Sequence, residues 1–301
     1  IDSFSEGTLS GKGGLSSDTG MTKCMSLIPD AEELARDSFS SNTLCAVNMA
    51  NCVDACLIRV SKGEKVDTPI HIINFCSSTS GSVAAVFPRM VIDMQDDSSL
   101  TIKQSYIGDS AAIDGGAAAQ DAEGAVVAVG SSSVQLGKGA KLEHTYEQEL
   151  PSSHRVLEVV NADLYESDAT YDLSILQSGA KTGRMNAHIN MHEPHSNCSL
   201  NSVHLSNSRQ SHDLHSSIVH SARECMSSQQ HRNVIGTRGE SVFKGRIRVP
   251  KVAQKTDSDQ LCRSLMLGEK ARVVAMPTLE ITADDVVCSP WGLSNRSRRE
   301  L

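Results

Sequence analysis

The chain has 301 residues, enough for one large domain or two ordinary ones, and a net charge of −8 at pH 7. Hydrophobic residues make up 39% of it but aromatic residues only 3%, so the core must be aliphatic, which favours thin, layered β architectures. An acidic chain whose one basic cluster is Arg296, Arg298 and Arg299 is a poor candidate for nucleic-acid binding.

The cysteines and the apolar runs indicate which cellular compartments fit this chain. Nine cysteines at irregular spacing, without a CxxC pair, argue against a disulfide framework and favour a reducing compartment. No apolar run approaches the roughly 18 residues of a membrane span, so we expect no membrane segment. The chain opens without Met and without a signal peptide, and we interpret it as a processed or partial sequence.

The first predicted unit is residues 1–41, a partly disordered segment with one short helix. Residues 1–20 are rich in Ser, Gly and Thr, a composition typical of disorder. Residues 29–39 read PDAEELARDSF, and the early proline and the two glutamates of the first turn predict the helix.

From about residue 42 the pattern predicts short strands with turns marked by Gly or Pro. Such runs occupy residues 57–60, 70–75, 90–94 and 100–106, and a Gly- and Ala-rich loop follows at 108–124.

The stretch from 154 to 250 is the most regular. Met185, Ala187, Ile189 and Met191 alternate with polar residues, a period of two that indicates a strand with one apolar face. Similar strands centre near residues 175, 189, 203 and 218, at intervals of roughly 14 to 15 residues, and a later one contains Ile247. A sandwich and a solenoid both fit this spacing, and the regularity with few aromatic rings favours a β-helix.

Eight of the eleven histidines lie between residues 188 and 231. A metal site of His188, His192 and His195 with Glu193 is one interpretation. It lacks the H-E-x-x-H order that places two imidazoles on one helix face. On a strand, His188 and His192 share a face but lie about 13 Å apart. We therefore favour a polar β surface that carries imidazoles, and we expect no metal site.

Catalytic motifs are missing as well. The chain contains no G-x-S-x-G element and no GxxxxGK[ST] loop, so neither a serine hydrolase nor a nucleotide-binding site is indicated. We expect a protein without catalytic activity of its own.

The C-terminal part carries four candidate site residues: Cys262, Asp284, Asp285 and Cys288. Arg263 follows Cys262 and could favour its thiolate, although a buried inert thiol fits equally. The Asp pair could serve acid–base chemistry or form a solvated turn. The residues alone leave these alternatives open.

Residues 242–289 read VFKGRIRVPKVAQKTDSDQLCRSLMLGEKARVVAMPTLEITADDVVCS. The F-x-G-R-I-R-V, A-Q-K-T-D, S-L-x-L and P-x-L-E-I-x-A-D-D-V-x-C-S elements, in this order, resemble the SufB/SufD family of the Suf iron–sulfur cluster assembly machine. Upstream, residues 58–63 and 68–71 resemble the family's early I-R-V-P-K-G…P-I-H element, and Asp213, His215 and His220 its histidine-bearing strand. The A-D-D-V-x-C-S form is similar to the SufD type.

The resemblance implies an all-β fold, a right-handed parallel β-helix over residues 42–289. It implies a scaffold that pairs with SufB and with the ATPase SufC, and that binds no cofactor stably although an iron–sulfur cluster forms transiently on the SufB–SufD assembly. Cys262 lies where SufB has a functional cysteine, so Cys262, Asp284, Asp285 and Cys288 are the interface candidates. The expected compartment is the plastid stroma in a eukaryote and the cytoplasm otherwise.

Residues 290–301 depart from the family pattern. Relatives continue C-S-H-G-A-T, whereas this chain has Pro290, Trp291 and Gly292 after Ser289. The helical segment that docks SufC in the family is not recognisable, which puts SufC binding in doubt. One base inserted before CAT-GGG-GCT gives CCA-TGG-GGC and converts His-Gly-Ala into Pro-Trp-Gly, so we interpret this segment as an out-of-frame, non-family tail.

Two alternatives come from other functional classes. A β-helix enzyme that acts on polysaccharide would need aromatic platforms, which this composition scarcely supplies. A stand-alone metal-binding protein would use the histidine-rich strands. Glycan cleavage would identify the first and stoichiometric metal the second, whereas co-purification with SufB-type and SufC-type chains would identify the scaffold.

Overall fold

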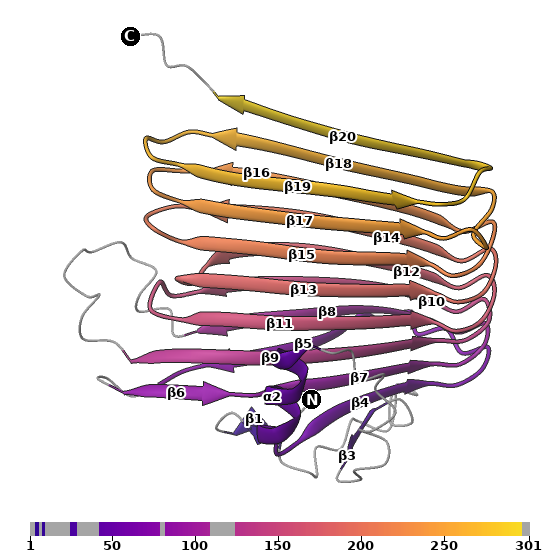
Figure 1. The fold of residues 1–301 in the computed structure, drawn as a ribbon. Coiled ribbons are helices and arrows are strands. Elements are labelled where there is room, and N and C mark those ends of the chain that lie inside the picture. Colours follow the sequence, from indigo (N-terminus) through magenta and orange to yellow (C-terminus); the bar gives the residue numbers. More distant parts are fainter. Residues whose placement is uncertain are drawn as a thin grey trace.

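The computed structural model describes residues 4–5, 8–9, 25–28, 42–78, 82–108 and 124–296, with side chains for 42–78, 82–108 and 124–288. In this part of the chain two parallel β-sheets lie face to face and the backbone winds between them in successive coils (Figure 1). The expected all-β, parallel β-helix is thereby confirmed. The helix expected at 29–39, the disorder expected at 1–20 and most of the loop expected at 108–124 lie outside the described residues.

From β7 onward the strands alternate between the two sheets along the chain. Sheet 1 contains β5 (Ile70–Cys76), β8 (Ser99–Gly108), β10 (Lys141–Leu150), β12 (Thr170–Gly179), β14 (Asn197–Ser206), β16 (Met226–Ile235), β18 (Thr256–Met266) and β20 (Val286–Arg296). Sheet 2 contains β3 (Met25–Ile28), β4 (Ala55–Val60), β6 (Val83–Val86), β7 (Arg89–Met94), β9 (Ala125–Leu136), β11 (Arg155–Leu164), β13 (Thr182–Met191), β15 (Ser211–His220), β17 (Glu240–Val249) and β19 (Arg272–Ile281). The short strands β1 (Phe4–Ser5) and β2 (Thr8–Leu9) pair with each other.

Successive coils stack in register. Paired residues on neighbouring coils lie 27 positions apart at Arg155 and Thr182 and 32 apart at Glu240 and Arg272. Each coil holds one strand of each sheet, which accounts for the strand interval of about half that length in the sequence. The strands predicted around residues 175, 189, 203, 218 and 247 are all present.

Both corners of the coil are turned by residues with positive φ. One corner stacks Asp97, Gly139, Asp168, His195, Glu224 and Lys255, and the other includes Ser208, Arg209, Arg238 and Lys270. Left-handed backbone is unfavourable for residues with a side chain. Here it is offset by coil-to-coil hydrogen bonds, such as Asp168 N–H to the Pro194 carbonyl at 3.2 Å and Glu224 N–H to the Gln254 carbonyl at 2.9 Å.

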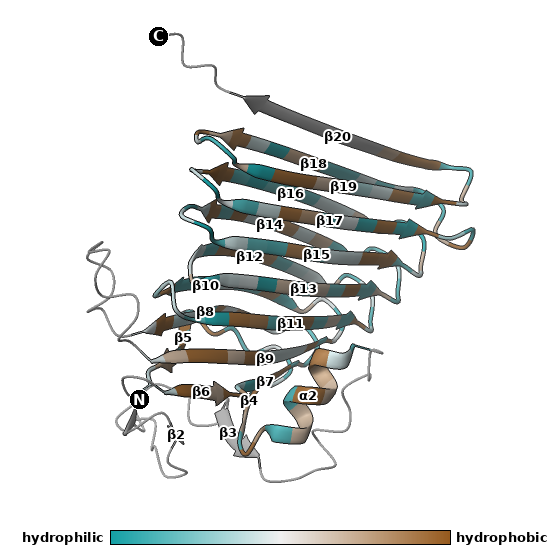
Figure 2. Cartoon of the chain, turned by 60° about the vertical axis from the view of Figure 1, so that its left-hand side comes forward, coloured by the Kyte–Doolittle hydropathy of each residue, from teal (hydrophilic) through white to brown (hydrophobic). Residues whose placement is uncertain are grey.

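Alternation along each strand sends every second side chain into the space between the sheets. In β13 the inward residues include Met185, Ala187, Ile189 and Met191, all fully buried. Figure 2 shows the resulting exchange of hydrophobic and hydrophilic positions along the strands. Each such Met or Ile side chain contributes about 1.5 to 3 kcal/mol of burial free energy, and the interior is one continuous cluster.

One helix, α2 (Thr43–Asn51), lies on the outer face of sheet 2 against β9 and β11 (Figure 1). The sequence analysis did not anticipate it. The side chain of Asn42 caps it by accepting a hydrogen bond from Leu44 N–H at 3.0 Å. No helix among the described residues is both long and apolar enough to cross a membrane.

The expected β-helix ended at residue 289, and the structure differs from this expectation. Strand β20 continues to Arg296 and pairs with β18 along its whole length, so the solenoid backbone extends past residue 290. Parallel pairing uses main-chain groups, so a segment without apolar periodicity can still add a strand. The out-of-frame origin of residues 290–301 stays a prediction.

Candidate functional site

The four predicted site residues all lie at the C-terminal end of the solenoid. Cys262 is on β18, Cys288 on β20, and Asp284 and Asp285 precede β20. Pairing sets Ser258 opposite Cys288, four residues before Cys262. At about 3.3 Å per residue, the two cysteines lie about 13 Å apart along the strands. The structure thus brings them to one end of the molecule without joining them in one centre.

Cys262 points into the interior and is 2% exposed. Its neighbour on the preceding coil is His231, also buried. Burial raises the pKa of the Cys262 thiol, and a hydrogen bond from Ser264 offsets this only in part. Arg263 alternates to the outer face and is exposed, so it does not share the thiol's surroundings. In the isolated chain Cys262 is a buried, protonated thiol.

Asp284 and Asp285 are exposed in the turn before β20. The backbone of Asp285 is fixed from both sides, since its N–H donates to Gln254 Oε1 at 2.9 Å and its carbonyl accepts from Lys255 N–H at 2.6 Å. The turn therefore presents carboxylates to solvent on a well-held backbone. Cys288 is half-buried nearby, and burial together with the charge of Asp257 raises its pKa.

The last strand of sheet 2 leaves the interior open. On β17 the inward residues Phe243 and Val249 are fully buried. Their register partners on β19 are Ala275 and Ile281, and both are exposed. The inward positions that are buried on β17 are thus exposed to solvent on β19. Met276, also on β19, adds an exposed apolar side chain on the opposite face of the strand. We call the exposed apolar residues Ala275, Met276, Pro277 and Ile281 the open end.

The metal interpretation of the histidines finds no support in the described residues. His192 donates to Asp163 Oδ1 at 2.9 Å, and His195 Nδ1 lies 3.3 Å from Glu224 Oε2, so the two imidazoles serve different carboxylates. No group of three or more metal-ligating side chains occurs in the part of the chain with described side chains.

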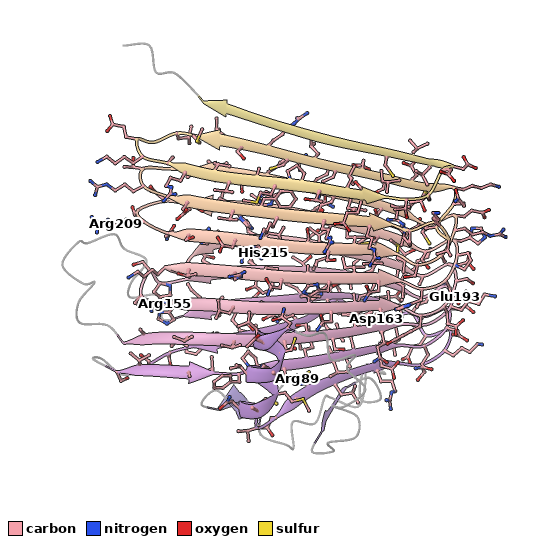
Figure 3. The ribbon with its side chains drawn as sticks, in the orientation of Figure 1. Arg89, Arg155, Asp163, Glu193, Arg209 and His215 are labelled. Atoms are coloured by element: carbon pink, nitrogen blue, oxygen red, sulfur yellow. The ribbon has the colours of Figure 1, made fainter. Side chains whose placement is uncertain are left out.

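The interpretation of the histidines as a polar β surface is wrong for four of the eight. His204, His212, His220 and His231 point into the solenoid and are fully buried. They occupy inward positions because their strands follow the register of the coils before them, in which the same columns hold buried residues. His215, by contrast, is on the outer face (Figure 3), where its Nδ1 accepts from Arg184 at 3.0 Å.

His204, His212 and His231 meet inside the solenoid with Ser241 and Phe243, and we call these five residues the histidine cluster. The His204 ring lies edge-on to His231 at 4.5 Å between centroids and 5.9 Å from His212, and His231 stacks on Phe243 at 4.5 Å. Such ring contacts stabilise a packed core, in addition to the area they bury.

Hydrogen bonds fix the tautomers of two of these rings. His212 Nε2–H donates to the Gly179 carbonyl at 2.8 Å, so its Nδ1 accepts from a serine hydroxyl. Ser241 donates its only proton to Asn233 Oδ1 at 2.8 Å and therefore accepts from His204 Nδ1–H at 3.1 Å. Burial lowers the pKa of His204, and lowers that of His231 to about 3, so the cluster is uncharged.

A second buried polar group lies nearer the N-terminal end, and we call Gln104, Tyr106, Ser132 and Glu158 the carboxyl cluster. Glu158 Oε2 accepts from the Tyr106 hydroxyl at 2.6 Å, and Oε1 accepts from Ser132 at 2.8 Å and from Gln104 at 3.4 Å. Burial raises the pKa of Glu158 to about 7, although these donors act against the shift. Gly130 makes the room, since a Cβ there would clash with Glu158 and Tyr106.

Sequence reasoning missed both clusters. Glu158 and the four inward histidines were not singled out as buried residues, and only their position in alternating strands gave a signal. Both clusters are polar and buried, which makes them parts of the solenoid's interior. The open end, by contrast, exposes apolar side chains to which another molecule can bind.

The comparisons with known proteins agree with this architecture. Residues 75–290 match the family model described as the SUF system FeS cluster assembly SufBD core domain. The chloroplastic protein ABCI7 of Arabidopsis thaliana is 30% identical over 257 residues, which are 83% of this chain and 51% of that protein.

Two bacterial relatives extend the likeness. An iron–sulfur cluster assembly SufBD family protein of Synechocystis is 26% identical, over 86% of this chain and 56% of its own length. The iron–sulfur cluster assembly protein SufD of Escherichia coli is 27% identical, over 77% of this chain and 52% of its own. The chain spans about half the length of these relatives. On its fold and on the family-model match, this chain belongs to the SufBD core family of the SUF iron–sulfur cluster assembly system.

Proposed function

We propose that the chain is a SufD-type scaffold subunit that pairs with a SufB-type chain through its C-terminal coils and catalyses no reaction alone. The observation that carries the proposal is the family match over residues 75–290, which includes nearly every coil of the solenoid. Relatives from Escherichia coli and Plasmodium falciparum are named as SufD. We place the pairing at the open end because it exposes apolar side chains beside the edge of β19, which pairs with no further strand in the part of the chain that the structure describes. Such a surface is suited to another β-chain.

In this assembly the iron–sulfur cluster is cargo rather than a resident cofactor. We propose that the cluster forms transiently where the two scaffold subunits meet, with Cys262, Cys288, Asp284 and Asp285 on this chain's side. Burial keeps the Cys262 thiol protonated, so its participation would require pairing to change its surroundings. The chloroplastic relative supports the plastid as the compartment if the source is a eukaryote.

The test is co-expression of the tagged chain with SufB-type and SufC-type chains from the same source. We expect the SufB-type chain to co-elute, and recovery of the SufC-type ATPase would extend the complex. Met276→Asp with Ile281→Asp, both at the open end, should abolish co-elution. Leu205→Asp is the matched control, because Leu205 is comparably exposed, at 42%, but lies on β14 in the other sheet, with β16 between it and β18. Retention by the open-end variant, or loss by the control, would contradict the proposed interface.

A second experiment addresses the thiol. Cys262→Ser should lower the rate of cluster formation on the reconstituted complex while co-elution persists. Cys198→Ser is the matched control, since Cys198 is also a buried inward thiol but on β14. Equal rates for Cys262→Ser and the unmodified complex would show that Cys262 has no part in assembly.

A further inference from the structure

The outer face of sheet 1 carries a column of aliphatic side chains near the ends of its strands. Leu205 on β14, Val234 on β16 and Leu265 on β18 are register partners on successive coils. They point away from the interior, because the residue before each of them in its strand is buried. Leu205 is 42% and Leu265 38% exposed, and Val234 is half-buried. We call these three residues the apolar column, and it runs along the axis of the solenoid.

A column of cations lies in the turns that follow these strands. Arg209, Arg238 and Lys270 are all exposed, and all three have positive φ. Each lies two residues before the first residue of β15, β17 or β19, and these first residues are aligned in register. The three cations are therefore stacked on successive coils, and we call them the basic column. Figure 3 labels Arg209 at this edge of the solenoid, on the same side as Arg155.

The basic column is not neutralised within the described part of the chain. None of its three cations forms an ion pair there, and Glu269 is the one acidic residue of these turns. At the opposite corner, by contrast, Lys255 Nζ lies 3.7 Å from Glu224 Oε1. Lys62 Nζ there lies 3.0 Å from Asp96 Oδ2. Because like charges on neighbouring strands repel one another, the basic column destabilises the free chain and favours an anionic partner.

The two columns lie beside each other along the same edge of the solenoid. In each coil the aliphatic residue precedes the cation by four or five residues. Such a stretch spans at most about 18 Å when fully extended, and the turn within it brings the two side chains closer. An α-helix with its side chains is about 10 to 12 Å wide. One helix can therefore contact both columns.

The repeat of the columns fits a helix better than an extended strand. Both columns repeat once per coil, at intervals of about 4.8 Å. A helix repeats every 5.4 Å, so its turns stay within about 1 Å of the columns over two intervals. An extended strand presents alternate residues about every 6.7 Å and is out of step by about 4 Å over the same length. The geometry thus favours a helix that lies parallel to the solenoid axis.

We propose that the apolar column and the basic column together form a docking surface for an amphipathic, acidic helix of a partner protein. The helix carries one aliphatic stripe and an adjoining stripe of Glu or Asp, each at intervals of three or four residues. Burial of the aliphatic stripe supplies affinity, and the ion pairs set the orientation of the helix. This surface lies apart from the open end, so the inference does not rest on the proposed function.

The test uses the full chain and two labelled, hydrocarbon-stapled helical peptides, each about four turns long. The first has Leu on one stripe and Glu on the adjoining stripe, and the second has the same composition with both residue types distributed around the helix. Fluorescence anisotropy measures their binding. We expect the first peptide to bind at least about tenfold more tightly, a difference of about 1.4 kcal/mol. Equal affinities would overturn the docking surface.

Charge reversal locates the binding site. Arg209→Glu with Arg238→Glu should weaken binding of the first peptide about tenfold, because two attractions become repulsions. Lys138→Glu with Lys251→Glu is the matched control, since both lysines are exposed in turns of the opposite corner, and its affinity should be unchanged. Leu205→Asp should also weaken the peptide but leave co-elution with the SufB-type chain intact. The docking surface and the proposed function can therefore fail separately.

A single reversal in the middle of the basic column separates binding from folding. Arg238→Glu places a carboxylate between Arg209 and Lys270, so the Tm from circular dichroism should not fall although peptide affinity does. A lower Tm with unchanged affinity would assign Arg238 a structural role and overturn the proposal. Sedimentation of the chain alone tests for a second copy on this surface. Self-association that Arg238→Glu abolishes would identify that copy as the occupant and overturn the partner helix.

Discussion

The carboxyl cluster and the histidine cluster both place ionisable groups in the interior of the solenoid, the first an acid and the second imidazole bases. Both are buried between the two sheets, and in both burial shifts the pKa of the ionisable group towards the uncharged form. Glu158 is held with a raised pKa of about 7, whereas the pKa of His231 is lowered to about 3. Because an acid stays neutral by keeping its proton and an imidazole by losing it, the two halves of one solenoid should respond to pH in opposite directions.

The largest expected effect is at Glu158. Its folded pKa lies above its ordinary value of 4.5, so unfolding releases a proton, and stability falls as pH rises from about 4.5 to about 7. The difference corresponds to a penalty on the order of 3 kcal/mol above pH 7. Glu158→Gln should remove this pH dependence and raise the unfolding free energy at pH 8, but not at pH 4.5, in denaturant titrations. The ionisable groups around the Glu158 carboxyl supply no cation at pH 8; they are Tyr106, Tyr146, Cys76 and His144.

A matched pair of glycine variants tests the packing of the two clusters. A Cβ on Gly130 would clash with Glu158 and Tyr106, and a Cβ on Gly245 would clash with Gln260 and Phe243. Gly130→Ala and Gly245→Ala should each cost about 1 to 3 kcal/mol by overpacking. Thermal unfolding followed by circular dichroism measures both. Gly63→Ala is unsuitable as the control because of its positive φ, so Ser174→Ala, on an exposed position of β12, serves instead. If Gly130→Ala or Gly245→Ala were as stable as Ser174→Ala, the cluster around that glycine would have space for an added methyl group, which would contradict the expected clash.

The histidine cluster should lose stability on the acid side. His231 has a folded pKa below its ordinary value of 6.5, so unfolding takes up a proton and stability falls as pH drops below 6.5 towards about 3. Each such histidine costs about 1.4 kcal/mol per pH unit once the unfolded chain is protonated. His231→Gln should reduce the acid slope between pH 6.5 and 5 by the share of one histidine and leave the Glu158 limb intact, since other histidines with lowered pKa values remain: His144, His204, His212, His215 and His220. If the unfolding free energy of His231→Gln fell towards acid pH as steeply as that of the unmodified chain, the contrast between the two clusters would be wrong.

The smallest effect is expected on the outer face. Arg246 pairs with Glu280 through two hydrogen bonds, one of them from Nε at 3.0 Å, but both side chains are well exposed. Such surface pairs contribute about 0 to 1 kcal/mol, so Arg246→Ala should shift the unfolding free energy by less than about 1 kcal/mol. A larger loss, measured by the same denaturant titration, would show that the outer face carries stability we assign to the interior.

The sequence predicted strands well where the two faces of a strand differ. In β13 the methionines, alanine and isoleucine mark the inward face, and the structure agrees. In β14 the inward residues include Ser202, His204 and Ser206, while Val203 and Leu205 point outward. The residue types of β14 do not indicate which of its faces is buried, because the register of the neighbouring coils decides this. The interior position of His204 was therefore invisible in the sequence.

Two further features depended on long-range contacts. Helix α2 is fixed by Asn48, whose partners are the carbonyls of Pro88 and Val129, far away in sequence. Glu158 is tolerated inside because Gly130, its register partner, carries no side chain. The site residues Cys262 and Cys288 were named as interface candidates from family resemblance, and their common location at the C-terminal end of the solenoid follows from coil stacking, which the resemblance implied. Their roles stay predictions.

Hydrogen–deuterium exchange on the chain with and without a SufB-type partner tests the central claim most directly. If the open end is the pairing surface, the partner should protect the amides of β19, the last strand of sheet 2 in the described stack, and those of β18, which precedes it in the same coil. The amides of β8 to β11, around the carboxyl cluster, should exchange as before. Protection that centres on β8 to β11, or a stable complex without protection of β18 and β19, would contradict the account.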